Sequence, residues 1–283
     1  MMSIETRLLR ARATRLSLGA LLLLTVACGG GDDAADSGAP GGDDKLLESF
    51  SFFVVNLEAV RELSGTTQGF GGDLRYGETG PGAGLRGADK ICAATAALSV
   101  PAAASKPWRA FLSATTGGAD GGPVHAKDRI GTGPWHDALG RLVASDLTQL
   151  LMERPGDADP AIRNDLPNQY GIPNHRDGGC TGSDCPDNHQ ILTGTAPDGT
   201  LYTELTPNTD STCDDWTSKE PRGKPRSGHS WPRTGSGASW LSAYDGDGCA
   251  PCTMAAPPGT DPPPCVGSTG GFGGFYCFVT NAP

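Results

Sequence analysis

Nine cysteines in a chain rich in glycine and proline constrain this sequence more than any other feature. Glycine and proline occupy 42 and 23 of the 283 positions, about 23% of the chain, and leave few side chains to build an apolar core. This composition argues against a helix bundle, a coiled coil and a polytopic membrane protein. We therefore expect a loop-rich fold that needs cross-links between cysteines in addition to hydrophobic burial.

The first 27 residues have the pattern of an export signal. Four arginines, the last of them Arg15, precede an apolar run from Leu16 to Ala27 that is too short to span a bilayer comfortably. The run ends in Leu24-Thr-Val-Ala-Cys28-Gly29, which resembles the lipobox of bacterial lipoproteins. The resemblance implies cleavage before Cys28, acylation of this new N-terminal residue, and sorting to the outer membrane. An ordinary signal peptide with an incidental cysteine is the alternative.

The lipid on Cys28 would make the membrane a partner of the chain, because each buried CH₂ group contributes about 0.8 kcal/mol of binding free energy. Residues 28–49 are rich in glycine and acids without apolar periodicity, so we expect a flexible tether there. Residues 50–283 would form the folded domain, in the periplasm or on the cell surface. Without residues 1–27 the formal net charge changes from −10 to −13, which makes a nucleic acid an unsuitable partner.

An exported chain with eight further cysteines favours structural disulfides. These cysteines are Cys92, Cys180, Cys185, Cys213, Cys249, Cys252, Cys265 and Cys277. The sequence leaves their connectivity open, although Cys180 and Cys185 are close enough to close a small loop. Cys249-Ala-Pro-Cys252 also has the spacing of a redox dithiol, or of half a four-sulfur zinc site. The proline-rich surroundings predict an irregular loop, which disfavours both of these alternatives.

Short apolar runs predict the secondary structure. The predicted strands cover residues 50–56, 108–112, 189–195, 200–206 and 275–280. Apolar residues at helical spacing from Leu85 to Leu98 predict a helix that ends before Pro101, and Asp146 is a candidate N-cap for a short helix. Asp198-Gly199 predicts a hairpin turn between the third and fourth strands. We expect the first and last strands to pair, and residues 154–188 and 218–272 to be mostly irregular.

Five short motifs occur in an order that resembles a known module. They are Leu85-Arg-Gly-Ala-Asp-Lys-Ile-Cys92, Trp108-Arg-Ala-Phe-Leu-Ser113, Gly-Thr-x-x-Asp-Gly at 194–199, Cys213-Asp-Asp-Trp216 and Tyr276-Cys-Phe278. Together they resemble the endostatin domain of basement-membrane collagens and its bacterial lipoprotein relatives. The resemblance implies an α+β, C-type-lectin-like fold over residues 50–283. Such a fold combines a mixed, mainly antiparallel sheet with short helices and long loops tied by disulfides.

The same resemblance implies two nested disulfides. Cys92 would pair with Cys277, and Cys213 with a cysteine that precedes the last strand. Three cysteines precede that strand here, where the family has one. Our preferred assignment is Cys213 with Cys265, and Cys249 with Cys252.

A basic loop in this acidic chain is the candidate ligand-binding feature. Five cations lie between Lys219 and Arg233 with a single acid, Glu220, among them. The predicted ligand-binding residues are Arg222, Lys224, Arg226, Trp231 and Arg233. They would bind an anionic polysaccharide, as arginine patches of endostatin bind heparin. The alternative is a solvated loop whose charges balance nearby acids.

Other motifs point less clearly to a ligand. Four aspartates are weak calcium candidates, because neighbouring carboxylates favour hard cations, with solvated turns as the alternative: Asp214, Asp215, Asp245 and Asp247. The five histidines are scattered without a zinc-binding spacing, and we expect no cofactor. Gly82-x-Gly84-x-x-Gly87 matches a dinucleotide fingerprint, but no strand precedes it, so a helix entry is the better interpretation.

These observations favour a membrane-anchored, non-enzymatic lipoprotein. Its C-type-lectin-like domain would bind polysaccharide or protein at the cell surface. The first alternative is an extracellular hydrolase, because Ser, His and Asp residues cannot be placed into a triad from the sequence. The second alternative is a purely structural or adhesive surface protein.

Overall fold

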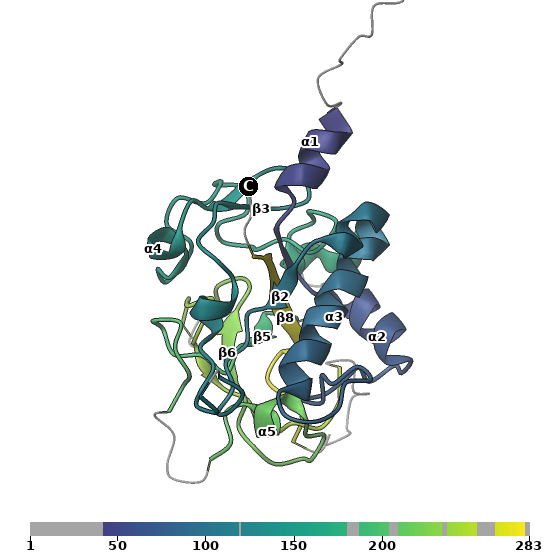
Figure 1. Cartoon of the computed structure of the whole chain (residues 1–283), viewed down its shortest axis with the longest axis vertical. Helices are drawn as coiled ribbons and strands as arrows, with labels where there is room; N and C mark the ends of the chain where they lie inside the picture. Colours follow the sequence, from purple (N-terminus) through teal and green to yellow (C-terminus); the bar gives the residue numbers. More distant parts are fainter. Residues whose placement is uncertain are drawn as a thin grey trace, which may run out of the picture. The chain divides into compact units, whose positions relative to one another are not determined.

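The central element of the fold is the last strand, β8 (Gly271–Val279), which is buried over its whole length. The computed structural model describes residues 42–118, 120–179, 187–203, 209–233, 237–253 and 264–280. β1 (Phe52–Val54) and β2 (Trp108–Ala110) both pair antiparallel with the second half of β8, and therefore lie on opposite edges of it. β5 (Gln190–Leu192) pairs parallel with the first half of β8, which makes the sheet mixed (Figure 1).

Four further strands complete the sheet structure. β6 (Arg226–His229) pairs antiparallel with β5, and β7 (Tyr244–Asp245) pairs antiparallel with β6. β3 (Trp135–His136) and β4 (Leu142–Ala144) form a separate antiparallel pair. The predicted fold class, α+β with a mixed and mainly antiparallel sheet, is therefore confirmed at this level.

The described helices are short, apart from one. The α-helices are α1 (Gly42–Ser49), α2 (Leu57–Ser64), α3 (Ala83–Ser99) and α4 (Leu147–Leu150), and α5 (Cys213–Trp216) is a single turn with left-handed backbone angles. The 3₁₀ helices are η1 (Pro101–Ser105), η2 (Ala126–Arg129) and η3 (Asn174–Gly179). Within the residues that the structure describes, no helix has the length and apolar character needed to cross a membrane.

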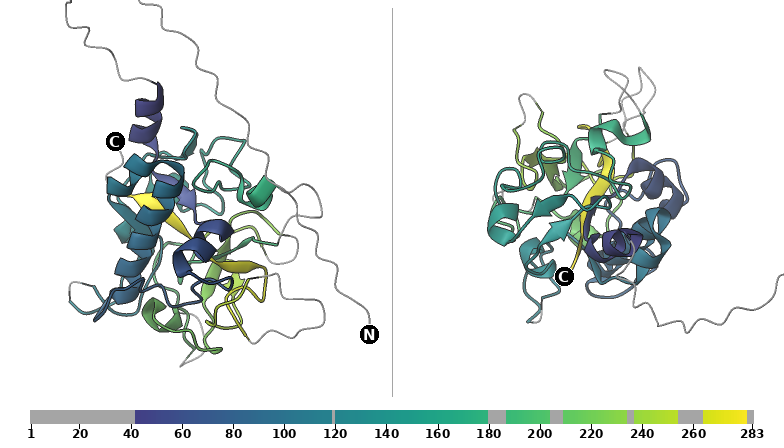
Figure 2. Two further views of the ribbon diagram at one scale, coloured as in Figure 1. Left: turned by 90° about the vertical axis from the view of Figure 1, so that its right-hand side faces the viewer. Right: turned by 90° about the horizontal axis from the view of Figure 1, so that it is seen from above.

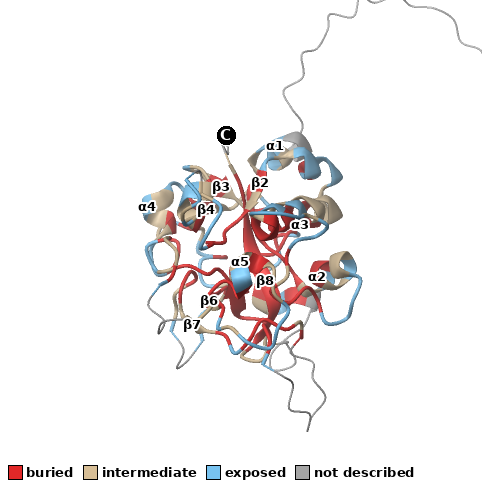
Figure 3. Ribbon diagram, turned by 60° about the horizontal axis from the view of Figure 1, so that its bottom comes forward, coloured by how far each residue is buried: buried red, intermediate tan, exposed pale blue. Residues whose placement is uncertain are grey.

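Side chains of β8 point alternately into two apolar clusters, as the two-residue period of a strand requires. Phe275 and Cys277 join the cluster under α2 and α3, whereas Tyr276 and Phe278 join the cluster on the other face, beside Trp240. The view from above in Figure 2 shows β8, in yellow, between the purple and blue N-terminal helices and the teal and green loops. In Figure 3 the buried residues concentrate around β8, while α1 and α2 present exposed residues outward.

The glycines of the Gly-x-Gly-x-x-Gly motif let two loops approach α3 closely. Gly82 is the left-handed N-cap, with φ of 71°. A Cβ atom on Gly84 would lie 2.1 Å from the carbonyl oxygen of Asp215, and one on Gly87 would lie 2.1 Å from that of Leu74. The motif therefore serves helix entry and packing, and it fixes α5 against α3.

Most of the predicted elements with strong apolar patterns are confirmed. β1, β2 and β8 lie within or across the runs predicted as strands, and β1 pairs with β8 as expected. α3 covers the predicted apolar face and ends before Pro101. The side chain of Asp146 caps α4, because it accepts a hydrogen bond from the backbone N–H of Gln149 at 2.9 Å.

The predicted hairpin around Asp198-Gly199 forms only as a turn. Its closing hydrogen bond runs from the N–H of Ala196 to the carbonyl of Thr200, and a single bridge joins Thr195 to Leu201. Residues 200–203 form no strand, and the rest of that predicted strand lies outside the described residues. β5 pairs with β6 and β8 instead, because these distant strands bury it completely, which a local hairpin could not do.

Several elements lie in segments that the sequence predicts to be irregular or flexible. β6 and β7 lie in the stretch expected to be irregular, because neither has an alternating apolar pattern. α1 lies within the segment expected to be a flexible tether. The ammonium group of Lys106 donates to the carbonyls of Leu47, Glu48 and Phe50 at 2.6–2.7 Å, which satisfies the C-terminal end of that helix.

Three disulfides join the described residues. Cys92–Cys277 links α3 to β8 as the resemblance implied. The preferred assignment of the others was wrong, because Cys213 pairs with Cys249, and Cys252 pairs with Cys265. A parallel bridge between Ala250 and Cys265 places Cys252 beside Cys265 and leaves Cys249 facing α5. Cys180, Cys185 and Cys28 lie outside the described residues.

Candidate functional site

A polar cavity of about 720 Å³ opens beside α5. It is lined by Thr115, Thr209, Asp210, Thr212, Asp214, Ser218, Arg222, Gly223 and Lys224, and we call it the Lys224 pocket. Hydroxyl groups, two carboxylates and two cations converge there. Such a wall matches a solute that carries many hydrogen-bonding groups better than an apolar one.

The backbone of α5 forms one wall of this pocket in a conformation that is costly for L-residues. Cys213, Asp214, Asp215 and Trp216 have φ of 52°, 55°, 53° and 65°, which makes α5 a left-handed turn without glycine. Each left-handed residue of this kind costs about 1–2 kcal/mol. Four in succession persist only when the surrounding structure holds them, and such strain is typical of functional sites.

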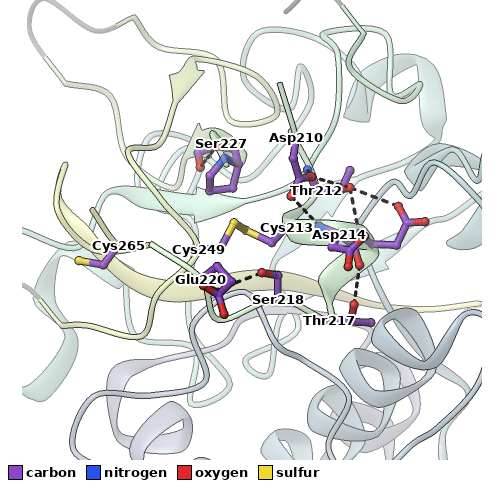
Figure 4. Close-up of a disulfide and its surroundings, with 12 residues drawn as sticks. Asp210, Thr212, Cys213, Asp214, Thr217, Ser218, Glu220, Ser227, Cys249 and Cys265 are labelled. Carbon is purple, nitrogen blue, oxygen red and sulfur yellow. Dashed lines mark hydrogen bonds between the residues drawn. A yellow bond between two sulfur atoms is a disulfide. The ribbon is translucent and has the colours of Figure 1, made fainter. Parts of the chain in front are cut away.

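Long-range contacts hold both ends of the left-handed turn. Cys213 is bonded to Cys249, and Figure 4 shows this disulfide next to Asp210 and Asp214. The indole of Trp216 is fully buried, and its Nε1–H donates to the carbonyl of Ser113 at 2.8 Å. The turn is therefore fastened to the core on one side and to the 249–252 loop on the other.

Two carboxylates fix the backbone around the pocket. The carboxylate of Asp215 accepts hydrogen bonds from the backbone N–H and the hydroxyl of both Thr115 and Thr116, at 2.5–3.1 Å. The carboxylate of Asp210 accepts from the backbone N–H of Thr212 at 2.9 Å and from that of Asp214 at 2.7 Å. Both acids therefore act as rigid supports of the wall.

The two cations of the pocket flank Gly223, a position at which any other residue would be strained. Gly223 has φ of 89°, and a Cβ atom there would lie 2.8 Å from the sulfur of Cys249. The close approach of this loop to the disulfide places Arg222 and Lys224 on the exposed rim. Neither side chain makes an ion pair with a described residue, so both charges remain available to a ligand.

The structure does not bring the five predicted ligand-binding residues together in one place. Only Arg222 and Lys224 line the pocket. Arg226 pairs with Asp245 at 2.9 Å and lies over the ring of Tyr202, 4.1 Å from its centroid. The other two, Trp231 and Arg233, lie beyond β6, where they stack on His175 and pair with Asp187 respectively. The extended strand β6 runs between these residues and separates the two ends of the basic loop.

The four calcium candidates are also dispersed. Asp215 is saturated by the threonines, Asp245 pairs with Arg226, and the carboxylate of Asp247 accepts from the hydroxyl of Ser268 at 3.0 Å. Asp214 lies on the pocket wall. In the part of the chain that the structure describes, no group of three His, Cys, Asp or Glu side chains is arranged to hold a metal ion.

Two histidines that the sequence left scattered lie in contact. The rings of His189 and His229 meet edge to face with their centroids 4.5 Å apart, and the ring of Tyr244 lies 5.0 Å from that of His229. Burial lowers the pKa of both imidazoles to about 4. Pairing of β5 with β6 creates this contact, so only a prediction of β6 could have revealed it.

Comparison with known proteins does not assign a function to this site. No protein-family model matches the sequence, and the search of curated proteins finds no significant relative.

Proposed function

We propose that this chain is an exported lipoprotein with a C-type-lectin-like fold, and that its Lys224 pocket binds an anionic polysaccharide at the cell surface without chemical conversion. The single observation that carries this proposal is the Lys224 pocket itself. It combines hydroxyls, the carboxylates of Asp210 and Asp214, and two cations that have no ion-pair partner among the described residues.

Three features support the lectin-like part of the proposal. The Cys92–Cys277 bond is the one that the resemblance to endostatin implied. The first and last strands pair, and the Cys-x-x-Trp motif forms a cross-linked turn at the N-terminal end of α3. Anchoring through Cys28 would keep this domain at the membrane, where long polysaccharides are accessible.

The chemistry of the pocket supports a polysaccharide as ligand. Sugar hydroxyls both donate and accept, and the threonine and serine hydroxyls of the wall have the same capacity. Arg222 and Lys224 supply the positive charge that a carboxylate or sulfate on the sugar would pair with. On an otherwise acidic chain this local charge also directs the orientation of an anionic ligand.

The hydrogen bonds of Asp210 and Asp215 support a structural rather than a catalytic role for these two acids. A general base needs an accessible lone pair directed at the substrate proton. The carboxylate of Asp210, on the pocket wall, instead accepts from the backbone N–H groups of Thr212 and Asp214. That of Asp215, which does not line the pocket, accepts from Thr115 and Thr116. Their work is to hold the left-handed turn in place.

The test compares retention of the full chain on immobilised uronic-acid and sulfated polysaccharides. The variant Arg222→Ala/Lys224→Ala removes the two pocket cations, and Arg163→Ala/Arg176→Ala is the matched control, because it removes two exposed arginines that are outside the pocket. Arg226 is left intact, because its pair with Asp245 supports the fold.

We expect the pocket variant to elute at clearly lower salt than wild type, and the control to elute with wild type. Co-elution of the pocket variant with wild type on every matrix would overturn the proposal. Release of new reducing ends from the bound polysaccharide would instead show that the chain cleaves it, as the hydrolase alternative requires.

A further inference from the structure

A second pocket of about 540 Å³ lies beside the first. It is lined by Leu63, Ser64, Phe70, Asp73, Arg75, Tyr76, Gly77, Glu78, Thr79 and Lys219, and we call it the Tyr76 pocket. Unlike that of the Lys224 pocket, its lining contains aromatic and aliphatic side chains as well as charged ones. This combination is typical of small-molecule sites, in which apolar surface supplies contact area and a few polar groups set orientation.

One short segment separates the two pockets. The N–H of Leu74 donates to the carbonyl of Trp216 at 2.9 Å, and an antiparallel bridge joins Asp73 to Thr217. Directly after this bridge, Ser218 lines the Lys224 pocket, and its neighbour Lys219 lines the Tyr76 pocket. The pockets are therefore on the two sides of one stretch of backbone.

Tyr76 has an unusual conformation for an exposed aromatic residue. Its φ is 44°, in the left-handed region where a bulky side chain is a genuine outlier. The residue is 38% exposed, although the edge of its ring meets Phe70 with centroids 6.0 Å apart. Its hydroxyl has no hydrogen bond to a described residue. The ring lines the pocket in a strained backbone conformation, and full burial of the ring does not offset this strain.

The segment that contributes residues to both pockets is positively charged. Lys219, Arg222 and Lys224 follow one another within six residues, with Glu220 as the one acid among them. Lys219 is 59% exposed on its side chain, and its ammonium is 4.0 Å from the carboxylate of Asp73, which Arg75 already neutralises. A chain of anionic sugars that passed from one pocket to the other would cross these charges.

We propose that the Tyr76 pocket is a second sugar subsite, in which the exposed ring of Tyr76 stacks on a residue of the same anionic polysaccharide that the Lys224 pocket holds. This inference rests on the function proposed above and adds a minimum ligand length, because one sugar cannot fill both pockets. Two linked subsites bind a long ligand more tightly than either binds a short one.

The test measures binding of size-fractionated uronic-acid and sulfated oligosaccharides by calorimetry. Tyr76→Asn and Tyr76→Gly remove the ring and introduce residues that tolerate a positive φ. Both variants should therefore unfold at a temperature no lower than that of wild type. Tyr76→Phe keeps the ring. Tyr170→Asn is the matched control, because Tyr170 is 37% exposed and lines neither pocket.

We expect the affinity of wild type to increase with ligand length, and the two ring-removing variants to lose this increase, with about tenfold weaker binding of the longest oligosaccharides. Binding of the shortest ligands should change little. Tyr76→Phe and Tyr170→Asn should bind as wild type does.

Two results would overturn the inference in different ways. Wild-type affinity for long oligosaccharides in both ring-removing variants would refute the second subsite while leaving the Lys224 pocket as a binding site. Failure of wild type to bind any of the oligosaccharides would refute the proposed function, and the inference with it.

Discussion

Replacement of His229 should reduce the acid sensitivity of this fold. The imidazole is fully buried, and its Nδ1 lies 3.1 Å from the carbonyl oxygen of Gly237, to which it donates in the neutral form. Its Nε2 has no hydrogen-bond partner among the described residues. A proton added there would create a buried charge without an acceptor, close to Arg154 and His189. Burial, followed by the neighbouring His189, lowers the pKa of His229 to about 4.

The direction of the pH effect follows from this lowered pKa. In the unfolded chain the pKa of a histidine is about 6.5, so between pH 6.5 and pH 4 the unfolded state binds more protons than the folded state. The free energy of unfolding therefore falls as the pH falls through this window. For one such site the loss between pH 7.5 and pH 5 is about 2 kcal/mol, equivalent to about 4–8 °C in Tm.

The assay is thermal unfolding of wild type and His229→Phe at pH 7.5 and pH 5. Phenylalanine keeps a ring that packs against Tyr244 but does not titrate. The Tm of the variant should fall less between the two pH values than that of wild type, by about 4–8 °C. Equal falls in the two proteins would refute the reasoning, and so would an imidazole of His229 that titrates near pH 6.5 in an NMR experiment.

Two further changes test how the fold supports the site. Removal of the Cys213–Cys249 bond by alanine at both positions should lower the free energy of unfolding by about 4 kcal/mol, since the residues are 36 apart in sequence, and should weaken polysaccharide retention. Loss of Cys252–Cys265 should leave retention unchanged. Equal retention by both variants would contradict the support of the pocket by the Cys213–Cys249 bond. Arg154→Met should lower the free energy of unfolding by about 3 kcal/mol or more, because the buried guanidinium donates to four backbone carbonyls. Denaturant titrations measure this loss, and an unchanged midpoint would show that water replaces the guanidinium.

The local pattern of apolar residues was sufficient to predict the elements that consist mainly of apolar residues. The run before Asn56 and the run after Gly274 contain enough aromatic residues to require burial, so two strands and their pairing were predictable. The helix of α3 was predictable because its apolar residues recur at helical spacing. The cysteine count gave cross-links, but their partners among Cys213, Cys249, Cys252 and Cys265 depended on which loops lie side by side.

The candidate site was predictable only in part. The basic loop drew attention to Arg222 and Lys224, and both line the pocket. The same argument included Arg226, which the structure uses in a partly buried pair with Asp245. A charge in a sequence is equally visible whether it is later paired or left exposed, so the sequence could not separate these two cases.

The sequence by itself determined that this chain needs a small, cross-linked core and where its strongest strands and its long helix lie. Only the tertiary structure decided that Cys213 to Trp216 form a left-handed turn and that Tyr76 holds a strained, exposed ring. Local preferences oppose both conformations, and neither leaves a signal in residue type or spacing. Contacts between segments distant in sequence, such as Cys213 with Cys249, supply the free energy that overrides those preferences.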